Sequence, residues 1–145
     1  MTARPLAVVA LSALVAGCGA PSLYQPMNLE GGYGNTRLAP DTFNVVFQGN
    51  GHTHRATAEA YALYRGAELT VEGGFDSFVV VGGTANATAL REAARNPFPP
   101  SADTDTDHPM VAITIRAFRG EQPSPQAFNA RDVLRELGPS IRRPS

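Results

Sequence analysis

The chain has 145 residues and a formal net charge of −1 at pH 7, from 12 basic and 13 acidic residues. This length accommodates one small domain, and the balanced charge argues against a nucleic-acid-binding protein, which typically carries a basic face or stripe. The single cysteine excludes a disulfide within the chain and a cysteine-rich zinc site. No apolar run reaches the roughly 18 residues that a transmembrane helix requires.

The first 18 residues have the pattern of a bacterial lipoprotein signal peptide. Arg4 gives a positive charge to the short N-terminal region, an apolar run extends from Leu6 to Val15, and the small residues Ala16 and Gly17 precede Cys18. The apolar run is too short to span a bilayer stably, so we expect a peptidase to remove it. A cysteine at this position of a bacterial lipoprotein receives a diacylglycerol and becomes the new N-terminus. We therefore expect a lipid on Cys18, with an ordinary secretory signal as the alternative.

The stretch after Cys18 predicts a flexible tether, because it contains Pro21, Pro26 and Gly31 and shows little periodicity. Gly19 stands where some bacteria use an aspartate to retain lipoproteins in the inner membrane. We therefore expect the protein at the outer membrane, facing the periplasm. The predicted organisation is a signal peptide over 1–17, a lipidated cysteine and tether over 18–32, one domain over 33–138 with a long loop over 84–109, and a frayed tail over 139–145.

The first half of the domain predicts two strands and a long helix. Residues 33–38 and 42–48 have strand character, the latter because apolar residues alternate with others. Thr53 is a suitable N-cap for a helix whose apolar stripe extends over residues 56–71. Two consecutive glycines at 73–74 provide a C-terminal stop.

The second half predicts two further strands and a second helix. Residues 75–81 contain a continuous apolar run that favours a central strand, and 110–119 alternate as a strand does. Between them, the proline-rich stretch 84–109 predicts a loop, with room for a short helix over 87–95. Asn129 is placed to cap a short C-terminal helix.

These elements follow the order β-β-α-β-β-α. We expect an α+β two-layer sandwich in which about four strands form the sheet and the long helix covers one face. The second strand, the long helix and the third strand should form a right-handed crossover. The third and fourth strands should pair antiparallel around the loop.

Several segments resemble the motifs of one protein family. Gly32–Leu38 is similar to G-Y-S-x-T-x-L, Phe47–Thr53 to F-x-G-N-G-x-T, Tyr61–Thr70 to Y-A-L-L-R-A-A-E-L-T and Gly74–Phe78 to G-Y-D-x-F. Ile115–Glu121 and Ala130–Leu134 resemble the last strand and last helix of the same family. The family comprises short bacterial envelope lipoproteins without an established activity. The resemblance implies the lipoprotein class and assigns no catalytic or cofactor-binding residue.

The turn before the long helix offers two candidate sites. Asn50, Gly51 and Thr53 stand at the helix start, where backbone amides can hold an anion. A plain tight turn is the simpler interpretation. His52 and His54 could ligate a transition metal, but the spacing implies no third ligand. Surface histidines are the simpler interpretation here as well.

Three further features of the sequence are candidates for a functional role. Arg65 and Glu68 are three apart at the border of the apolar stripe and predict a structural ion pair, with a catalytic glutamate as the alternative. Leu69 projects opposite the stripe and would suit a partner contact. Residues 103–107 alternate aspartate with threonine, as at the start of a calcium loop. The required glycine and glutamate are missing at its sixth and twelfth positions, so we expect a solvated acidic loop.

The sequence as a whole favours a non-enzymatic envelope lipoprotein that acts as an interaction or accessory module through a sheet face or edge. Its expected contacts are the membrane, through the lipid on Cys18, and an envelope protein or peptidoglycan, without cofactor, metal or nucleic acid. A cell-wall or small-ligand-binding module, with an anion near residues 50–55, is the alternative. A minor hydrolase that uses Glu68 or the two histidines is a third hypothesis.

Overall fold

The computed structural model describes residues 19–100 and 108–145, which form a five-stranded sheet and three α-helices. In chain order the elements are β1 (Gly32–Ala39), β2 (Thr42–Gln48), α1 (Arg55–Glu72), β3 (Ser77–Gly83), α2 (Ala87–Arg95), β4 (Met110–Phe118), β5 (Phe128–Asn129), α3 (Ala130–Leu137) and the 3₁₀ helix η1 (Gly138–Ser140). The α+β class, the long helix and the short C-terminal helix are confirmed. The fifth strand, β5, has only two residues and is too short for a sequence pattern to show.

The strands are arranged in the order β1-β2-β4-β3-β5, and all neighbours pair antiparallel. The predicted antiparallel pairing of the third and fourth strands is confirmed. Because β4 inserts between β2 and β3, these two strands run parallel without touching, and α1 crosses over β4 to connect them. The expected crossover from β2 through α1 to β3 is therefore present, but β4 lies between the two strands that it connects.

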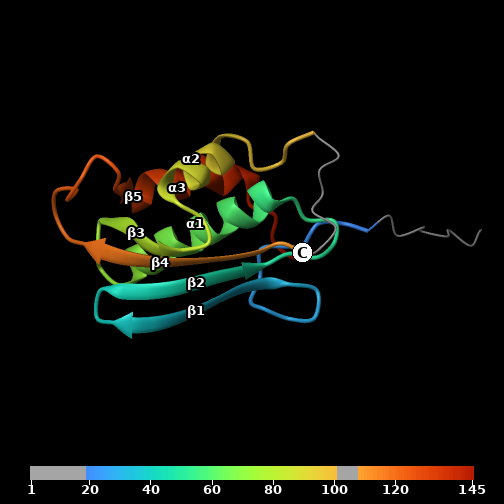
Figure 1. Cartoon of the computed structure of the whole chain (residues 1–145), viewed down its shortest axis with the longest axis horizontal. Coiled ribbons are helices and arrows are strands. Elements are labelled where there is room, and N and C mark those ends of the chain that lie inside the picture. Colours follow the sequence, from blue (N-terminus) through green and yellow to red (C-terminus); the bar gives the residue numbers. More distant parts are fainter. Residues whose placement is uncertain (1–18, 101–107) are drawn as a thin grey trace, which may run out of the picture.

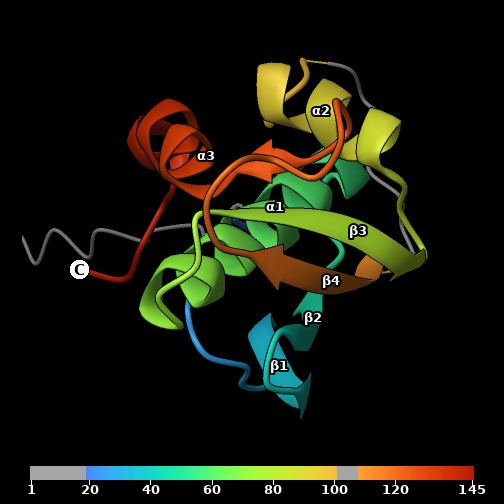
Figure 2. The same cartoon turned by 90° about the vertical axis from the view of Figure 1, so that its left-hand side faces the viewer.

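The helices form a layer on one face of the sheet (Figure 1 and Figure 2). α1 packs on β2 and β4, and α2 and α3 both pack on α1. No helix in the described part of the chain covers the opposite face (Figure 1). The domain thus has one buried sheet face and one open face, as the alternation along β2 and β4 requires.

The core forms where the alternating strands meet α1. The inward-facing side chains of β2 and β4 are buried: Phe43, Val45, Phe47, Val111, Ile113, Ile115 and Ala117. α1 approaches β4 closely at Gly66, where an added Cβ would lie 3.3 Å from Cδ1 of Ile115. The glycine that costs helix propensity at this position therefore allows tight helix–sheet packing.

Two details of α1 differ from the prediction. The helix begins at Arg55 with His54 at the N-cap, so Thr53 is one residue too early and is instead fully buried. Leu69 is buried rather than exposed. The sequence stripe identifies only the side of the helix that faces the sheet, whereas α2 and α3 cover further parts of its surface.

The predicted tether is wrong for its larger part, because the chain packs on the domain from Ser22 onward. Ser22 and Tyr24 are buried, and the backbone N–H of Tyr24 donates to the carbonyl oxygen of Arg142 (2.8 Å). The predicted frayed tail is wrong as far as Arg143, since the N–H of Arg142 donates to the hydroxyl of Tyr61 and Nη2 of Arg143 donates to that of Tyr64, both at 3.2 Å. The two ends of the domain are thus hydrogen-bonded to each other. The composition of the two stretches does not indicate this contact.

The remaining boundaries need smaller corrections. Within the stretch 84–109, the short helix that the sequence allowed over 87–95 is confirmed as α2, and its N-cap Asn86 accepts a hydrogen bond from the N–H of Ala89 (2.9 Å). β3 continues through Gly82 to Gly83. The signal peptide, Cys18 and the acidic stretch 103–107 lie outside the described residues. None of the described helices combines the length and the hydropathy that a membrane span needs.

Candidate functional site

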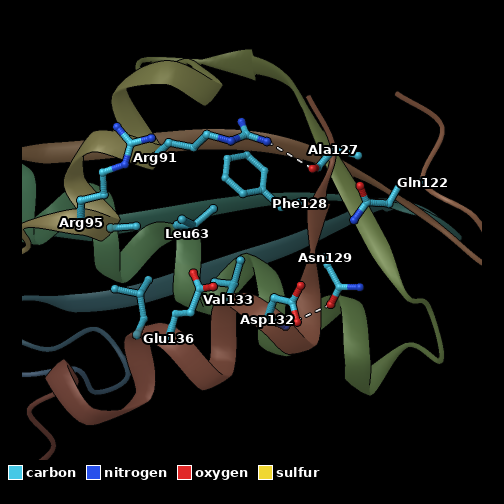
Figure 3. Close-up of a pocket in the computed structure, with 12 residues that line it drawn as sticks. Leu63, Arg91, Arg95, Gln122, Ala127, Phe128, Asn129, Asp132, Val133 and Glu136 are labelled. Atoms are coloured by element: carbon cyan, nitrogen blue, oxygen red, sulfur yellow. Dashed lines mark hydrogen bonds between the residues drawn. The ribbon is translucent and has the colours of Figure 1, made fainter. Parts of the chain in front are cut away.

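A groove of about 390 Å³ lies between α2 and α3 (Figure 3). It exists because both helices pack on α1 and leave a gap above it. Its lining consists of Leu63 from α1, Arg91, Ala94 and Arg95 from α2, Gln122 and Ala127 from the loop before β5, Phe128 and Asn129 from β5, and Asp132, Val133, Glu136 and Leu137 from α3.

Apolar side chains form the floor of the groove. Leu63, Val133 and Leu137 are buried there. Phe128 is buried as well, and its ring stacks on that of Phe78 with centroids 5.3 Å apart. The floor is therefore part of the packed core and offers an occupant a firm apolar contact.

Arg91 holds the short strand β5 in place and borders the groove. Its guanidinium lies 4.2 Å from the centroid of the Phe128 ring, within cation–π range. Its Nη2 donates to the carbonyl oxygens of Gln126 (2.9 Å) and Ala127 (3.2 Å). Figure 3 shows the side chain extended along the upper side of the groove by these contacts.

The two sides of the groove carry opposite charges. Arg91 and Arg95 line the α2 side, and Asp132 and Glu136 line the α3 side (Figure 3). Arg95 and Asp132 each form an ion pair with a residue three positions away on the same helix, at 3.2 and 2.8 Å. Exposed pairs of this kind contribute about 0–1 kcal/mol, so an occupant could exchange them at little cost. The groove therefore suits a ligand that carries both charges and an apolar group.

None of these groove residues stands out in the sequence as a candidate site. The signal is nevertheless there, because Arg91 and Arg95 are four apart, as are Asp132 and Glu136. Residues four apart share one face of a helix. The sequence does not show that the two helices border the same gap.

The turn that offered a candidate anion site is bonded within the protein itself, in line with the simpler interpretation of a tight turn. The side-chain oxygen of Asn50 accepts from the N–H of His52 and from the hydroxyl of Thr53, both at 2.9 Å. The backbone N–H of Asn50 donates to Oγ of Ser22 (2.8 Å), and the N–H of Thr53 donates to the carbonyl oxygen of Asn50 (3.1 Å). Gly51 lies within this turn. These amides therefore already have partners and hold the N-terminal segment.

The predicted pair of Arg65 and Glu68 is present, with Nη1 and Oε1 3.4 Å apart. The hydroxyl of Tyr24 donates to the same carboxylate oxygen, and Nη2 of Arg143 lies 4.0 Å from the other. Burial raises the pKa of Tyr24, and the hydrogen bond to Glu68 raises that pKa further. This cluster joins α1 to both ends of the domain, which is a structural role.

The histidines and Glu68 are too far apart to act together. His54 caps α1 and Glu68 is fourteen residues further along it, which corresponds to about 20 Å at 1.5 Å per residue. Among the described residues, no group of three or more His, Cys, Asp or Glu side chains is placed to hold a metal ion.

No protein-family model, curated protein or solved structure matches this chain. A function must therefore account for the groove and the N-terminal pattern by their own chemistry.

Proposed function

We propose that this chain is a membrane-anchored envelope lipoprotein, lipidated on Cys18 and located at the outer membrane facing the periplasm. The N-terminal pattern supports the anchor, because the only cysteine of the chain directly follows an apolar run and two small residues. Two acyl chains give stable membrane attachment where one is marginal. The resemblance to envelope lipoproteins points in the same direction.

The domain acts as a non-enzymatic interaction module, and its groove between α2 and α3 receives a polypeptide segment of mixed charge. The observation that carries this function is the placement of arginines and carboxylates on opposite sides of an apolar floor. A carboxylate of the segment pairs with Arg95, a basic group pairs with Glu136, and an apolar side chain rests on the floor. The open groove leaves Glu136 exposed to water, which suits reversible binding better than chemistry that requires a dry site.

The anchor is tested by replacing Cys18 with alanine in cells and separating membrane from soluble material. We expect the wild-type chain in membranes, with a mass that includes the acyl chains, and the C18A chain in the soluble fraction. A C18A chain that stays in the membrane would refute the lipid anchor.

The groove is tested with a charge-swapped double variant, R95E/E136K, which preserves the net charge of the chain. Photocrosslinkers placed at Gln122 and, as a control, at Thr114 on the open sheet face would identify contacts in cells. The partner captured from Gln122 and not from Thr114 is then purified and titrated against both chains. We expect the double variant to bind at least tenfold more weakly with unchanged thermal unfolding. Equal affinity for both chains would refute the groove as the binding site.

Cell-wall binding is the alternative, because peptidoglycan stem peptides also carry both carboxylates and amines. If the wild-type chain sediments with purified cell-wall sacculi and R95E/E136K does not, the ligand of the groove is peptidoglycan. If neither chain sediments, the cell-wall alternative is refuted.

The hypothesis of a small anion bound at Asn50, Gly51 and Thr53 loses its support. The backbone amides of Asn50 and Thr53 already donate hydrogen bonds within the fold.

A further inference from the structure

The chain is hydrogen-bonded to the domain from Ala20, two positions after the expected lipidation site Cys18. The side-chain amide of Asn50 donates to the carbonyl oxygen of Ala20 (2.8 Å), and Oγ1 of Thr53 accepts from the N–H of Ser22 (2.9 Å). Gly19 lies against His52, because a Cβ at Gly19 would overlap the imidazole ring. The N-terminal segment is therefore hydrogen-bonded to the domain from Ala20 onward and packs on it from Ser22 onward.

This attachment limits how far the domain can lie from a lipid on Cys18. Only Gly19 separates Cys18 from Ala20, and these two residue steps span at most about 7 Å when fully extended. The polar headgroup region on each side of a bilayer has a similar thickness, about 5–7 Å. A domain anchored in this way therefore touches the membrane with the end that surrounds Ala20.

Exposed apolar side chains gather at this same end. Gly32, Gln48 and Met110 form the last paired row of β1, β2 and β4, and Met110 is 54% exposed. The turn that precedes Gly32 carries Met27, which is 45% exposed, and Leu29, which is fully exposed. In Figure 1, the first described residues, this turn and the start of β4 all lie at the right-hand end of the domain.

The turn is built in a way that keeps Leu29 outside the domain. The N–H and carbonyl groups of Asn28 and Gly31 bond to each other across it, at 3.1 and 3.2 Å, and the N–H of Glu30 donates to Oδ1 of Asn28 (2.8 Å). The carbonyl oxygen of Glu30 in turn accepts from Oγ of Ser22 (2.7 Å). A fixed turn thus presents a leucine to the surroundings beside the anchored segment.

We infer that Met27, Leu29 and Met110 seat this end of the domain in the interface of the bilayer that holds the lipid of Cys18. The inference rests on the proposed lipidation, and the lipid surface is the partner. In this orientation the strands stand upright on the membrane. The turn between β1 and β2 lies about 23 Å further out, from the seven residue steps of β1 at about 3.3 Å each.

The test uses tryptophan fluorescence, because the chain contains no tryptophan. L29W places one at the proposed membrane end, and L38W is the matched control at the far end of β1, where Leu38 is 58% exposed. M110W reports on the same end from another strand. The purified lipidated chains are reconstituted into phosphatidylcholine vesicles with and without brominated acyl chains, so that apolar contact rather than lipid charge is measured.

We expect brominated lipid to quench L29W and M110W at least threefold more than L38W, with a blue-shifted emission in both. Similar quenching in all three variants would overturn the orientation while leaving the lipid anchor intact. A purified chain whose mass lacks the acyl groups would overturn the proposed lipidation, and the orientation with it. Circular dichroism of each variant confirms that the fold is retained.

Discussion

Replacing Tyr24 with alanine is the most direct test of whether the N-terminal segment belongs to the domain. The side chain is 2% exposed, and its ring meets those of Tyr61 and Tyr64 edge-to-face, with centroids 5.5 and 5.2 Å apart. Truncation of a buried aromatic residue costs about 3–5 kcal/mol. Because small domains are stable by about 5–15 kcal/mol, we expect Y24A to lose a large part of the free energy of unfolding.

The conservative variant Y24F separates packing from the hydrogen bond. It keeps the ring contacts and removes only the hydroxyl that donates to Glu68. A hydrogen bond to a charged group contributes about 1.5–3 kcal/mol, so we expect an intermediate loss of stability. Urea denaturation followed by circular dichroism measures all variants, with L29A as a control in the same segment. L29A should change the free energy of unfolding by less than about 0.5 kcal/mol, because Leu29 is fully exposed. A Y24A chain as stable as L29A would refute the packed segment.

The Y24F variant also tests how the free energy of unfolding changes at alkaline pH. Burial and Glu68 raise the pKa of Tyr24 in the folded state, whereas in the unfolded chain it is about 10. The folded state therefore retains a proton that the unfolded state releases, and this contribution to stability is present below pH 10 and lost as the pH rises above it. Burial also raises the pKa of Tyr61, which stays in both proteins. We expect the wild-type free energy of unfolding to fall more steeply above pH 10 than that of Y24F, and equal slopes would contradict the assignment.

Three further substitutions test other parts of the fold by the same denaturation assay. G83A should destabilise by about 2–4 kcal/mol, because Gly83 has φ +116° and an added Cβ would overlap the carbonyl oxygen of Ala112. N129A removes the side chain that caps α3 and should cost about 1 kcal/mol. D76N should reduce the loss of free energy of unfolding that acid causes below about pH 4. The hydrogen bond from the N–H of Gly120 holds the pKa of Asp76 below its ordinary value, so the ionised carboxylate stabilises the fold and this contribution is lost when acid protonates it. If D76N loses stability in acid as steeply as the wild-type chain does, other carboxyl groups cause the acid sensitivity.

Local patterns were sufficient to predict most of the elements. The alternation in β2 and β4, the apolar stripe of α1 and the cap at Asn129 each depend on residues a few positions apart. The fate of the N-terminal segment depends on partners far along the chain. Ser22 bonds to Thr53, and Tyr24 bonds to Arg142. Its prolines and glycines are typical of a linker, and only the tertiary contacts make it part of the core.

The candidate site could be predicted only in fragments for a related reason. The sequence identified the pair of Arg65 and Glu68, and the structure shows it as part of a cluster that also includes Tyr24 and Arg143. The groove requires two helices to be placed on either side of α1, which no local pattern specifies. Leu69 shows the same limit, because it is buried although it lies opposite the apolar stripe of α1.

The packed N-terminal segment also connects the two proposals. Tyr24 bonds to the backbone of Arg142, in the tail that follows α3 directly through η1, and α3 provides the acidic side of the groove. A lipid on Cys18 would therefore fix the groove in orientation as well as in place, because no flexible linker intervenes after Ala20. Figure 1 shows the helices lying along one face of the sheet, so on an upright domain the helices that border the groove stand beside the strands. The two proposals can then be tested together, because a variant that changes the orientation of the lipidated domain would also change where the groove lies relative to the membrane.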